Sequence, residues 1–272
     1  MYRTGGHRCN VRSAGDRSNH GAFSPEGNAY SCFICGKHSV RSIIAHFTSW
    51  KEAGDLIKEY SNELIYYGTI EKERATNVQW PPDCATQMPS IHAKYLHKRG
   101  YDPKLLRELY GVECCYQTGF MKYRIVIPVY QNGVIVTYVG RDVTNKAPLK
   151  YKNLPERNSV LPVKETIFNI DNVHEKAIIC EGPFDAMRFG AHGVCTWGLQ
   201  FTSRQTNILA KRLKHAFIMF DSDPTAQAKG RELGAILSFQ GVTTDIVFIE
   251  EYKDPGELPQ HIADDVKREL LQ

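Results

Sequence analysis

The chain has 272 residues, a formal net charge of +4, 42% hydrophobic residues and 24% charged residues. These values are typical of a globular protein and exclude a wholly disordered or fibrous chain. No apolar stretch approaches the roughly 20 residues that a membrane span needs. The polar, basic beginning of the chain is not a secretory signal, so we expect a cytoplasmic location.

The first 40 residues contain almost no aliphatic side chains and cannot bury a core of their own. Within them, Cys32 and Cys35 form a Cys-x-x-Cys knuckle, whose two thiolates can bind one Zn²⁺. Cys9 is the best third ligand because it is the only other cysteine of this segment. His7 can reach the same ion from two residues earlier, and His20 is the alternative to His7 as the fourth ligand. We therefore predict that zinc holds this segment together.

The remaining cysteines lack the spacing of metal ligands. They are Cys84, Cys114, Cys115, Cys180 and Cys195. A chain of this length builds its own core, so we expect these thiols to be reduced and partly buried.

Apolar residues recur at spacings of three and four between Val40 and Ser61, which predicts an amphipathic helix. We accordingly expect a zinc-binding domain with its following helix over residues 1–60. The periodicity is then lost, and the Pro81-Pro82 pair is typical of a linker, which we place at residues 61–89.

A basic subdomain of mixed α and β structure is predicted over residues 90–165. Its expected helices are Ile91–Leu96 and Pro103–Tyr110, and its expected strands are Arg124–Tyr130 and Val134–Val139. The Asn132-Gly133 pair between the two strands is typical of a tight hairpin turn. Residues 94–157 carry twelve Lys and Arg against five Asp and Glu. Positive charge mixed with tyrosines is what binding of single-stranded nucleic acid requires.

Short apolar runs alternate with helical stretches over residues 166–272, the pattern of βαβ units. The expected strands are Ala177–Cys180, Val194–Trp197, Ala216–Phe220 and Asp245–Ile249, and the helices between them are Phe184–Ala191, Ser203–Lys214 and Ala226–Gln240. We therefore predict an α/β domain with a mostly parallel central sheet, in a chain that is α+β overall.

Carboxylates follow three of these expected strands. Glu181 and Asp185 follow the first, Asp221 and Asp223 the third, and Asp254 the last. Parallel strands place these acids at one edge of the sheet, where a divalent cation would offset their repulsion. A lone Asp-x-Asp is more often a solvated turn or a helix cap, but three acidic strand ends together favour a Mg²⁺ site.

These motifs together resemble bacterial DnaG-type DNA primases and their short phage relatives. The segment Phe23–Gly36 is similar to the second half of the primase zinc ribbon. Glu181-Gly182-Pro183-Phe184-Asp185, Phe220-Asp221-Ser222-Asp223 and Lys253-Asp254-Pro255 resemble the motifs of a Toprim catalytic domain. The segments similar to the preceding basic subdomain are Tyr95-Leu96, Arg99-Gly100, Arg124–Pro128, Val139–Arg141 and Lys150–Asn153.

The resemblance implies an enzyme that synthesises short RNA primers on single-stranded DNA during replication, in a bacterial or phage-infected cytoplasm. Ribonucleoside triphosphates would be its substrates, and Zn²⁺ with Mg²⁺ or Mn²⁺ its metals. It implies Glu181, Asp221, Asp223 and Asp254 as magnesium ligands, with Asp185 as a companion catalytic acid. The residues implied in binding nucleic acid or nucleotide are Arg99, Arg124, Arg141, Lys150, Tyr151 and Asn153. No Walker-type phosphate loop occurs in the sequence, so we expect a separate replicative helicase.

The sequence departs from the primase pattern at three places. One residue, not two, separates His7 from Cys9; Gly256 stands where the family has a second acid; and Thr225-Ala226 replaces Ala-Gly. Two alternative functions therefore stay open, a Toprim-type nuclease and a non-catalytic factor that binds single-stranded DNA.

Overall fold

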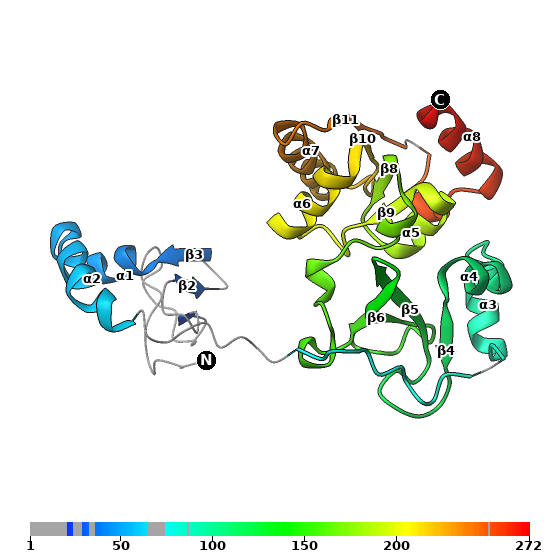
Figure 1. Ribbon diagram of the computed structural model, residues 1–272, viewed down its shortest axis with the longest axis horizontal. Coiled ribbons are helices and arrows are strands. Elements are labelled where there is room, and N and C mark those ends of the chain that lie inside the picture. Colours follow the sequence, from blue (N-terminus) through cyan, green and yellow to red (C-terminus); the bar gives the residue numbers. More distant parts are fainter. Residues whose placement is uncertain (1–20, 24–28, 33–35, 65–73, 86, 250) are drawn as a thin grey trace. The chain divides into compact units, whose positions relative to one another are not determined.

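The computed structural model describes residues 21–23, 29–32, 36–64, 74–85, 87–249 and 251–272. The chain divides into two compact units, Met1–Lys72 and Glu73–Gln272, which are described separately (Figure 1). The division falls inside the predicted linker. None of the described helices is long and apolar enough to cross a membrane.

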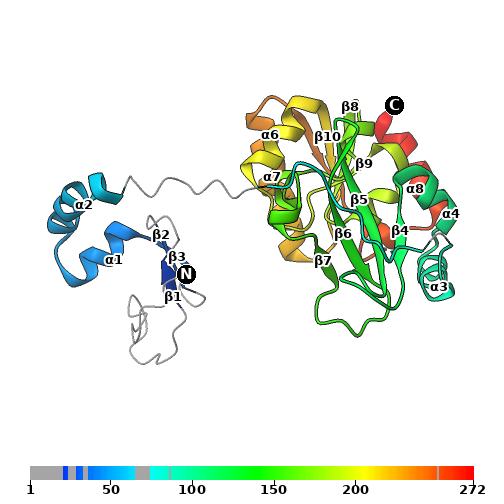
Figure 2. The ribbon, with the colours of Figure 1, turned by 60° about the horizontal axis from the view of Figure 1, so that its bottom comes forward.

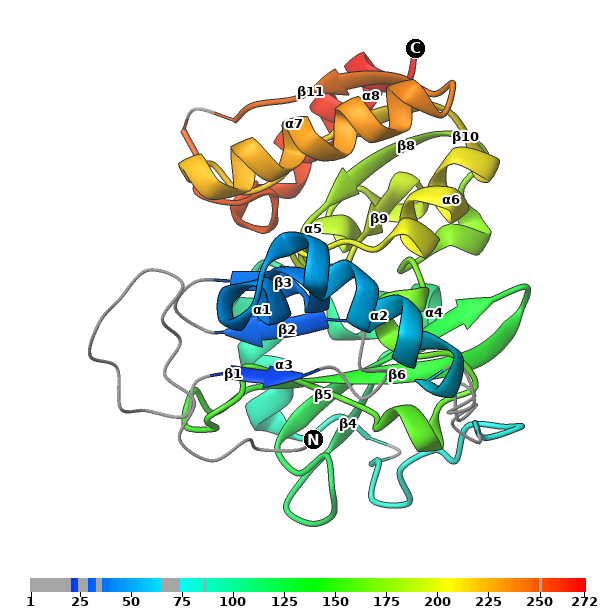
Figure 3. The ribbon, with the colours of Figure 1, turned by 90° about the vertical axis from the view of Figure 1, so that its left-hand side faces the viewer.

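The first unit contains a three-stranded antiparallel sheet and two helices (Figure 3). The strands β1 (Gly21–Phe23), β2 (Ala29–Cys32) and β3 (Gly36–Ser39) are followed by α1 (Val40–Phe47) and α2 (Trp50–Leu64). Cys32 ends β2 and pairs with Gly36, so the predicted knuckle lies at the β2–β3 connection. The other predicted zinc ligands, His7, Cys9, Cys35 and His20, lie outside the described residues, as does the Cys32 side chain.

The single helix predicted over Val40–Ser61 is in fact two helices. The Thr48 hydroxyl donates to the carbonyl of Ile44 at 3.0 Å and ends α1, and the Ser49 hydroxyl accepts from the Glu52 N–H at 3.1 Å and caps α2. Hydroxyl side chains compete for backbone groups in this way at helix ends, which apolar periodicity does not reveal.

The second unit begins with α3 (Ser90–Lys98) and α4 (Pro103–Tyr110), beside an antiparallel sheet. Its strands pair in the order β4 (Glu113–Cys115), β5 (Arg124–Gln131), β6 (Val134–Asp142) and β7 (Tyr151–Asn153). The predicted hairpin is confirmed: Gln131 pairs with Val134, and Asn132 and Gly133 have φ angles of 55° and 74°. Two positive φ angles are what a type I′ turn requires.

A second sheet follows, with all neighbouring strands parallel, as predicted. Its order is β11 (Thr243–Ile246), β10 (Leu213–Ile218), β8 (Glu175–Cys180) and β9 (Gly193–Cys195). The helices are α5 (Pro183–Met187), α6 (Ser203–Arg212), α7 (Pro224–Phe239) and α8 (Gln260–Leu271). Short 3₁₀ helices lie at Glu156–Asn158, Val163–Glu165, Ile170–Asn172, Gly190–His192 and Pro255–Glu257.

The parallel sheet is covered by helices on both faces, with α6 and α7 on one side and α8 on the other (Figure 2), and α5 lies on the same side as α8 (Figure 1). Side chains alternate accordingly along β8. Ala177 and Ile179 pack with the α6 and α7 residues Leu209 and Leu233, whereas Ile178 faces the other cluster.

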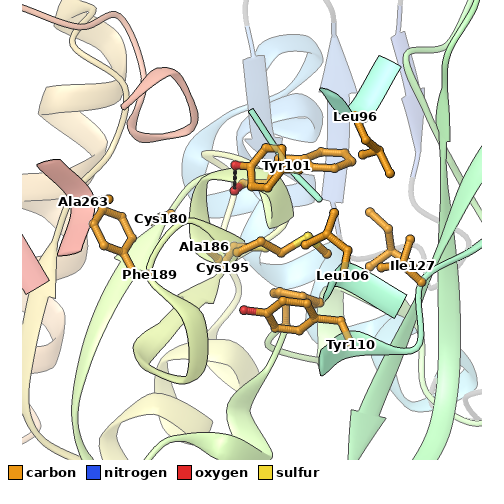
Figure 4. Close-up of a cluster of buried hydrophobic side chains, with 14 of the residues drawn as sticks. Leu96, Tyr101, Leu106, Tyr110, Ile127, Cys180, Ala186, Phe189, Cys195 and Ala263 are labelled. Carbon is orange, nitrogen blue, oxygen red and sulfur yellow. Dashed lines mark hydrogen bonds between the residues drawn. The ribbon is translucent and has the colours of Figure 1, made fainter. Parts of the chain in front are cut away.

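One hydrophobic core joins the two sheets of the second unit. Its buried side chains come from the basic subdomain and from the parallel sheet alike, among them Leu96, Leu106, Ile127, Cys180 and Cys195 (Figure 4). The Tyr101 hydroxyl also donates to the carbonyl of Phe184 at 2.6 Å. The acidic strand ends and the basic subdomain are therefore held on one framework.

Candidate active site

The acidic residues predicted from the sequence gather at the carboxyl edge of the parallel sheet. Glu181 directly follows β8, and Asp221 lies three residues beyond the end of β10. The Ser222 N–H and hydroxyl both donate to the carbonyl of Lys253, at 2.9 and 3.0 Å, which fixes the loop before Asp254 beside the loop after β10. The topology thus brings acids from three strands together.

Asp185 and Asp254 meet at the backbone of Gly256. Asp185 Oδ2 accepts from the Gly182 N–H at 3.1 Å, in the first turn of α5. A Cβ atom at Gly256 would lie 2.5 Å from Asp185 Oδ1 and 3.1 Å from Asp254 Oδ1. The site therefore has no room for a side chain at position 256 unless the two carboxylates move.

Burial and mutual repulsion raise the pKa values of three of these acids. Burial, followed by the charges of Asp221 and Asp223, raises the pKa of Glu181 to about 7. Burial, then Asp254 and Asp221, raises the pKa of Asp185 to about 7. For Asp221, burial and the charges of Asp254 and Asp223 raise the pKa to about 6. Nearby cations offset this repulsion only in part, as expected of a site that binds a cation.

The donor set fits a hard divalent cation. Asp221 Oδ1 and Asp254 Oδ1 are buried and have no hydrogen-bond partner among the described residues. Carboxylate oxygens are ligands that Mg²⁺ accepts, together with water and phosphate oxygens. Within that part of the chain, no three His, Cys, Asp or Glu side chains already converge as a finished metal site. A metal bound here would have to complete its coordination with water or phosphate oxygens.

Asp223 caps the helix α7. It is exposed, and its Oδ1 accepts from the N–H groups of Thr225 and Ala226 at 3.0 and 3.2 Å, at the beginning of α7. The helix-cap alternative for the Asp-x-Asp pair is thus correct for Asp223. Asp221 makes no such bond.

A cationic cavity of about 510 Å³ lies next to the acids, between α3, β6 and residues 255–260. Its lining includes Lys98, Arg99, Arg141, Arg188 and Gly256. Arg99 Nη2 lies 3.2 Å from the position of a Cβ atom on Gly256, and the charge of Arg99 lowers the pKa of Asp185 against the larger effect of burial. Two of the residues predicted to bind nucleic acid or nucleotide, Arg99 and Arg141, therefore line a cavity that adjoins the acids at Gly256.

The other predicted basic residues differ in what their side chains reach. Arg141 is 5% exposed, and its guanidinium stacks on Tyr151 and Tyr95, at 4.8 and 5.6 Å from the ring centroids. Lys150 and Asn153 are exposed, on either side of the half-buried Tyr151. Arg141 is thus held rigidly, whereas Lys150 and Asn153 are accessible from solvent.

Arg124 points inward. It is 6% exposed and donates to the carbonyls of Gly140, Leu149 and Lys150 at 3.0, 2.8 and 3.3 Å. Its guanidinium therefore shapes the loop that carries Lys150. The basic composition of the segment gave no sign of this difference between Arg124 and Arg141.

Two cationic residues near the acids, Lys164 and Arg188, were not predicted from the sequence as part of the site. Lys164 Nζ donates to the carbonyls of Trp197 and Gln200 at 2.6 and 2.7 Å, and its charge lowers the pKa of Glu181 against the larger effect of burial. Arg188 is 2% exposed and donates to the carbonyls of Arg99, Gly100 and Gly256 at 2.7, 3.2 and 2.8 Å. Arg188 thereby joins the last acidic motif to the basic subdomain.

Comparisons with known proteins agree with this arrangement. A Toprim-like family model matches residues 178–258, which contain all five predicted acids. A DNA primase from Aquifex aeolicus (strain VF5) is 24% identical over 91% of this chain, and one from Legionella pneumophila is 27% identical over 55%. The chain spans 59% and 28% of the length of these two relatives.

Solved structures show the same fold. The zinc-binding and RNA polymerase domains of the Aquifex aeolicus primase match all of this chain and 79% of that one, with a TM-score of 0.57 and 20% identity. A DnaG primase catalytic domain bound to single-stranded DNA matches 67% of this chain and 73% of that one, with a TM-score of 0.53 and 18% identity. The predicted combination of a basic subdomain and a Toprim-like sheet is confirmed.

Proposed function

We propose that this chain, which is similar in sequence and fold to DnaG-type DNA primases, synthesises short RNA primers on single-stranded DNA by metal-dependent nucleotidyl transfer. The observation that carries this proposal is the junction at Gly256. There, carboxylates from the parallel sheet lie beside a cavity lined by Arg99 and Arg141. Joining nucleotides requires both a cation site and a phosphate site around the same reacting atoms.

The acids would hold one or two divalent cations, Mg²⁺ or Mn²⁺. Glu181, Asp221, Asp223 and Asp254 supply the oxygen ligands. A bound cation would lower the pKa of the attacking 3′-hydroxyl and neutralise charge on the α-phosphate and the leaving pyrophosphate. The Gly182 N–H holds the Asp185 carboxylate against the backbone of Gly256, where it would help to orient the neighbouring ligand Asp254.

The cavity would bind phosphate groups of the incoming ribonucleotide or of the template. Arg99 and Arg141 present guanidinium groups that bind phosphate oxygens in pairs. Arg141 is held by Tyr95 and Tyr151, so little side-chain entropy is lost on binding. The exposed Lys150 and Asn153 extend this surface.

The zinc-binding domain and the helicase complete the proposal. We infer that His7, Cys9, Cys32 and Cys35 bind Zn²⁺, with His20 as the alternative to His7, and that this domain helps to select where a primer begins. A separate replicative helicase would supply the single-stranded template. Zinc content of the wild type, His7→Ala and His20→Ala identifies the fourth ligand, because only loss of a true ligand lowers the zinc bound per chain.

The test of the main proposal is primer synthesis by the full chain. Purified protein is incubated with single-stranded DNA of mixed sequence, four ribonucleotides, one of them labelled, and Mg²⁺ or Mn²⁺. Short labelled RNA is expected only with template. The double variant Asp221→Asn with Asp223→Asn should lose at least about 100-fold of the synthesis. Asp265→Asn is the matched control, an exposed acid on α8 that should leave the rate unchanged.

Four results contradict the proposal. Product without template contradicts template-directed synthesis, and synthesis that survives the double substitution contradicts the metal-dependent mechanism. Degradation of the DNA without nucleotides supports the nuclease instead. Tight binding of single-stranded DNA with no synthesis supports the non-catalytic factor.

A further inference from the structure

Two cysteines outside the acidic site face each other where residues 74–85, at the beginning of the second unit, meet β4. Cys84 and Cys115 form an isolated antiparallel β-bridge, and their Sγ atoms are 2.8 Å apart. The Ala85 N–H donates to the carbonyl of Cys114 at 2.8 Å, so the bridging hydrogen bond lies beside the pair and not within it. Cα atoms in such a pair are about 4.5 Å apart, which is within the range of disulfides.

Both cysteines are free in the structure, and Cys84 is half-buried whereas Cys115 is 1% exposed. Among the residues that the structure describes, no third His, Cys, Asp or Glu completes a metal site with them. Two sulfur atoms that face each other at this distance need only a small approach to bond covalently. We propose that Cys84 and Cys115 are a thiol–disulfide modification site that small-molecule disulfides oxidise.

The chemistry is a two-step exchange. The Cys84 sulfur, which solvent reaches, attacks a small disulfide RSSR and forms a mixed disulfide with one RS group. The other RS group leaves as RSH with the proton that Cys84 loses. The Cys115 sulfur then attacks the Cys84 sulfur, and the second RSH leaves with the Cys115 proton. Two protein thiols are oxidised by two electrons, and the reagent is reduced to two thiols.

The surroundings of the pair determine how fast this exchange is. The hydrogen bond to Cys115, together with burial, raises the pKa of the Cys84 thiol well above its usual range. Thiolate is the attacking species, so we expect slow oxidation at neutral pH and faster oxidation at alkaline pH. Such a pair stays reduced in a reducing buffer and responds to sustained oxidation.

The disulfide would lock a segment that carries the connection to the first unit. This segment, residues 74–85, is here named the strap. Its Trp80 ring lies 5.3 Å from the Tyr138 ring centroid, and Arg74 makes two hydrogen bonds to Glu165 at 3.1 and 2.8 Å. These non-covalent contacts can open, whereas a bond from Cys84 to β4 fixes the end of the strap to the sheet.

Cys114 provides a control within the same strand. It is buried like Cys115, but it packs in the core between the two sheets, whereas Cys115 packs with Tyr138 in a separate cluster. Neighbouring residues of a strand point to opposite faces, so Cys114 cannot reach Cys84. A random oxidation would not distinguish Cys114 from Cys115, but the proposed one does.

The experiment uses the reduced full chain with zinc present, incubated with mixtures of oxidised and reduced glutathione at mildly alkaline pH. Remaining thiols are alkylated, the protein is digested without reduction, and the peptides are analysed by mass spectrometry. We expect one cross-linked pair, Cys84 to Cys115, which is lighter than the two free peptides by two hydrogen atoms and disappears after reduction. Cys114→Ser should keep this cross-link, and Cys84→Ser should abolish it.

Thermal unfolding gives a second measurement on the same samples. Oxidation should raise the midpoint for the wild type and Cys114→Ser, because a closed loop restricts the unfolded chain, and should leave Cys84→Ser unchanged. The proposal is overturned if Cys84 remains a glutathione adduct, pairs with Cys114 or a cysteine of the first unit, or stays reduced when oxidised glutathione is in large excess. The wild-type peptide map decides this even if a variant does not fold.

Discussion

Replacing Asp185 with Asn should stabilise the metal-free protein at neutral and alkaline pH. Burial, then Asp254 and Asp221, raises the pKa of Asp185 from 3.8 to about 7. The native state therefore holds this proton more tightly than the unfolded chain. The stability gained from this tighter proton binding is complete at pH values below the pKa of the carboxyl in the unfolded chain. It is lost as the pH rises through the pKa of the same carboxyl in the folded protein. At about pH 8 the carboxylate opposes folding, and a neutral amide does not.

The expected size follows from the two pKa values. Their difference corresponds to about 4 kcal/mol in the free energy of unfolding. Asp221 ionises in competition with Asp185, so we expect about half of this value, ~2 kcal/mol. For a protein of this size, that is a rise of roughly 4–8 °C in Tm. Asn can still accept from the Gly182 N–H, so the cap of α5 is kept.

The measurement is thermal unfolding in buffer without divalent cations, at about pH 5 and about pH 8. The Tm of Asp185→Asn should be higher than that of the wild type by the expected amount at the higher pH, and by much less at the lower pH. Asp265→Asn, an exposed acid on α8, should match the wild type at both. Added Mg²⁺ should stabilise the wild type more than Asp185→Asn. The repulsion argument fails if Asp185→Asn is less stable than the wild type at the higher pH without metal.

Three further substitutions test the surroundings of the site. Gly256→Ala should displace the Asp185 carboxylate, because the new Cβ would lie 2.5 Å from its Oδ1. We expect weaker Mn²⁺ binding in a titration and a free energy of unfolding that is lower by about 1–3 kcal/mol. Unchanged Mn²⁺ affinity and stability would refute the close contact. Arg188→Met removes hydrogen bonds to three backbone carbonyls, of which the bond to Gly256 is buried, so Tm should fall by roughly 6–12 °C in thermal unfolding. Lys164→Met removes a charge that lowers the pKa of Glu181, so Mn²⁺ binding followed against pH should need a higher pH; a shift to lower pH would contradict this sign.

Much of the fold follows from local patterns that tertiary structure does not override. The alternation of apolar runs and helical stretches led to a parallel sheet, and the acids after β8 and β10 had to share its edge. The Asn132-Gly133 turn was equally predictable, because asparagine and glycine adopt positive φ angles at lower cost than other residues. These signals depend on a few neighbouring residues, so they can be read from the sequence.

Other features depend on contacts between distant segments and were not predictable. The short strands β4 and β7 lack a periodic pattern and form because β5 and β6 offer them hydrogen bonds. The roles of Arg124 and Arg188 depend on which carbonyls face them after folding. Composition predicts how many cations a segment has, but not whether each one faces solvent or the interior.

The absence of an acid at position 256 acquires a physical reason in the structure. A side chain there would meet Asp185 Oδ1 at 2.5 Å, so glycine is what permits Asp185 and Asp254 to lie against the same stretch of backbone. The carbonyl of Gly256 accepts from Arg188, which also donates to the carbonyl of Arg99. Any movement of the last acidic motif must therefore move the cationic cavity with it. Through Arg188, the backbone at position 256 thus links the position of Asp254 to that of Arg99.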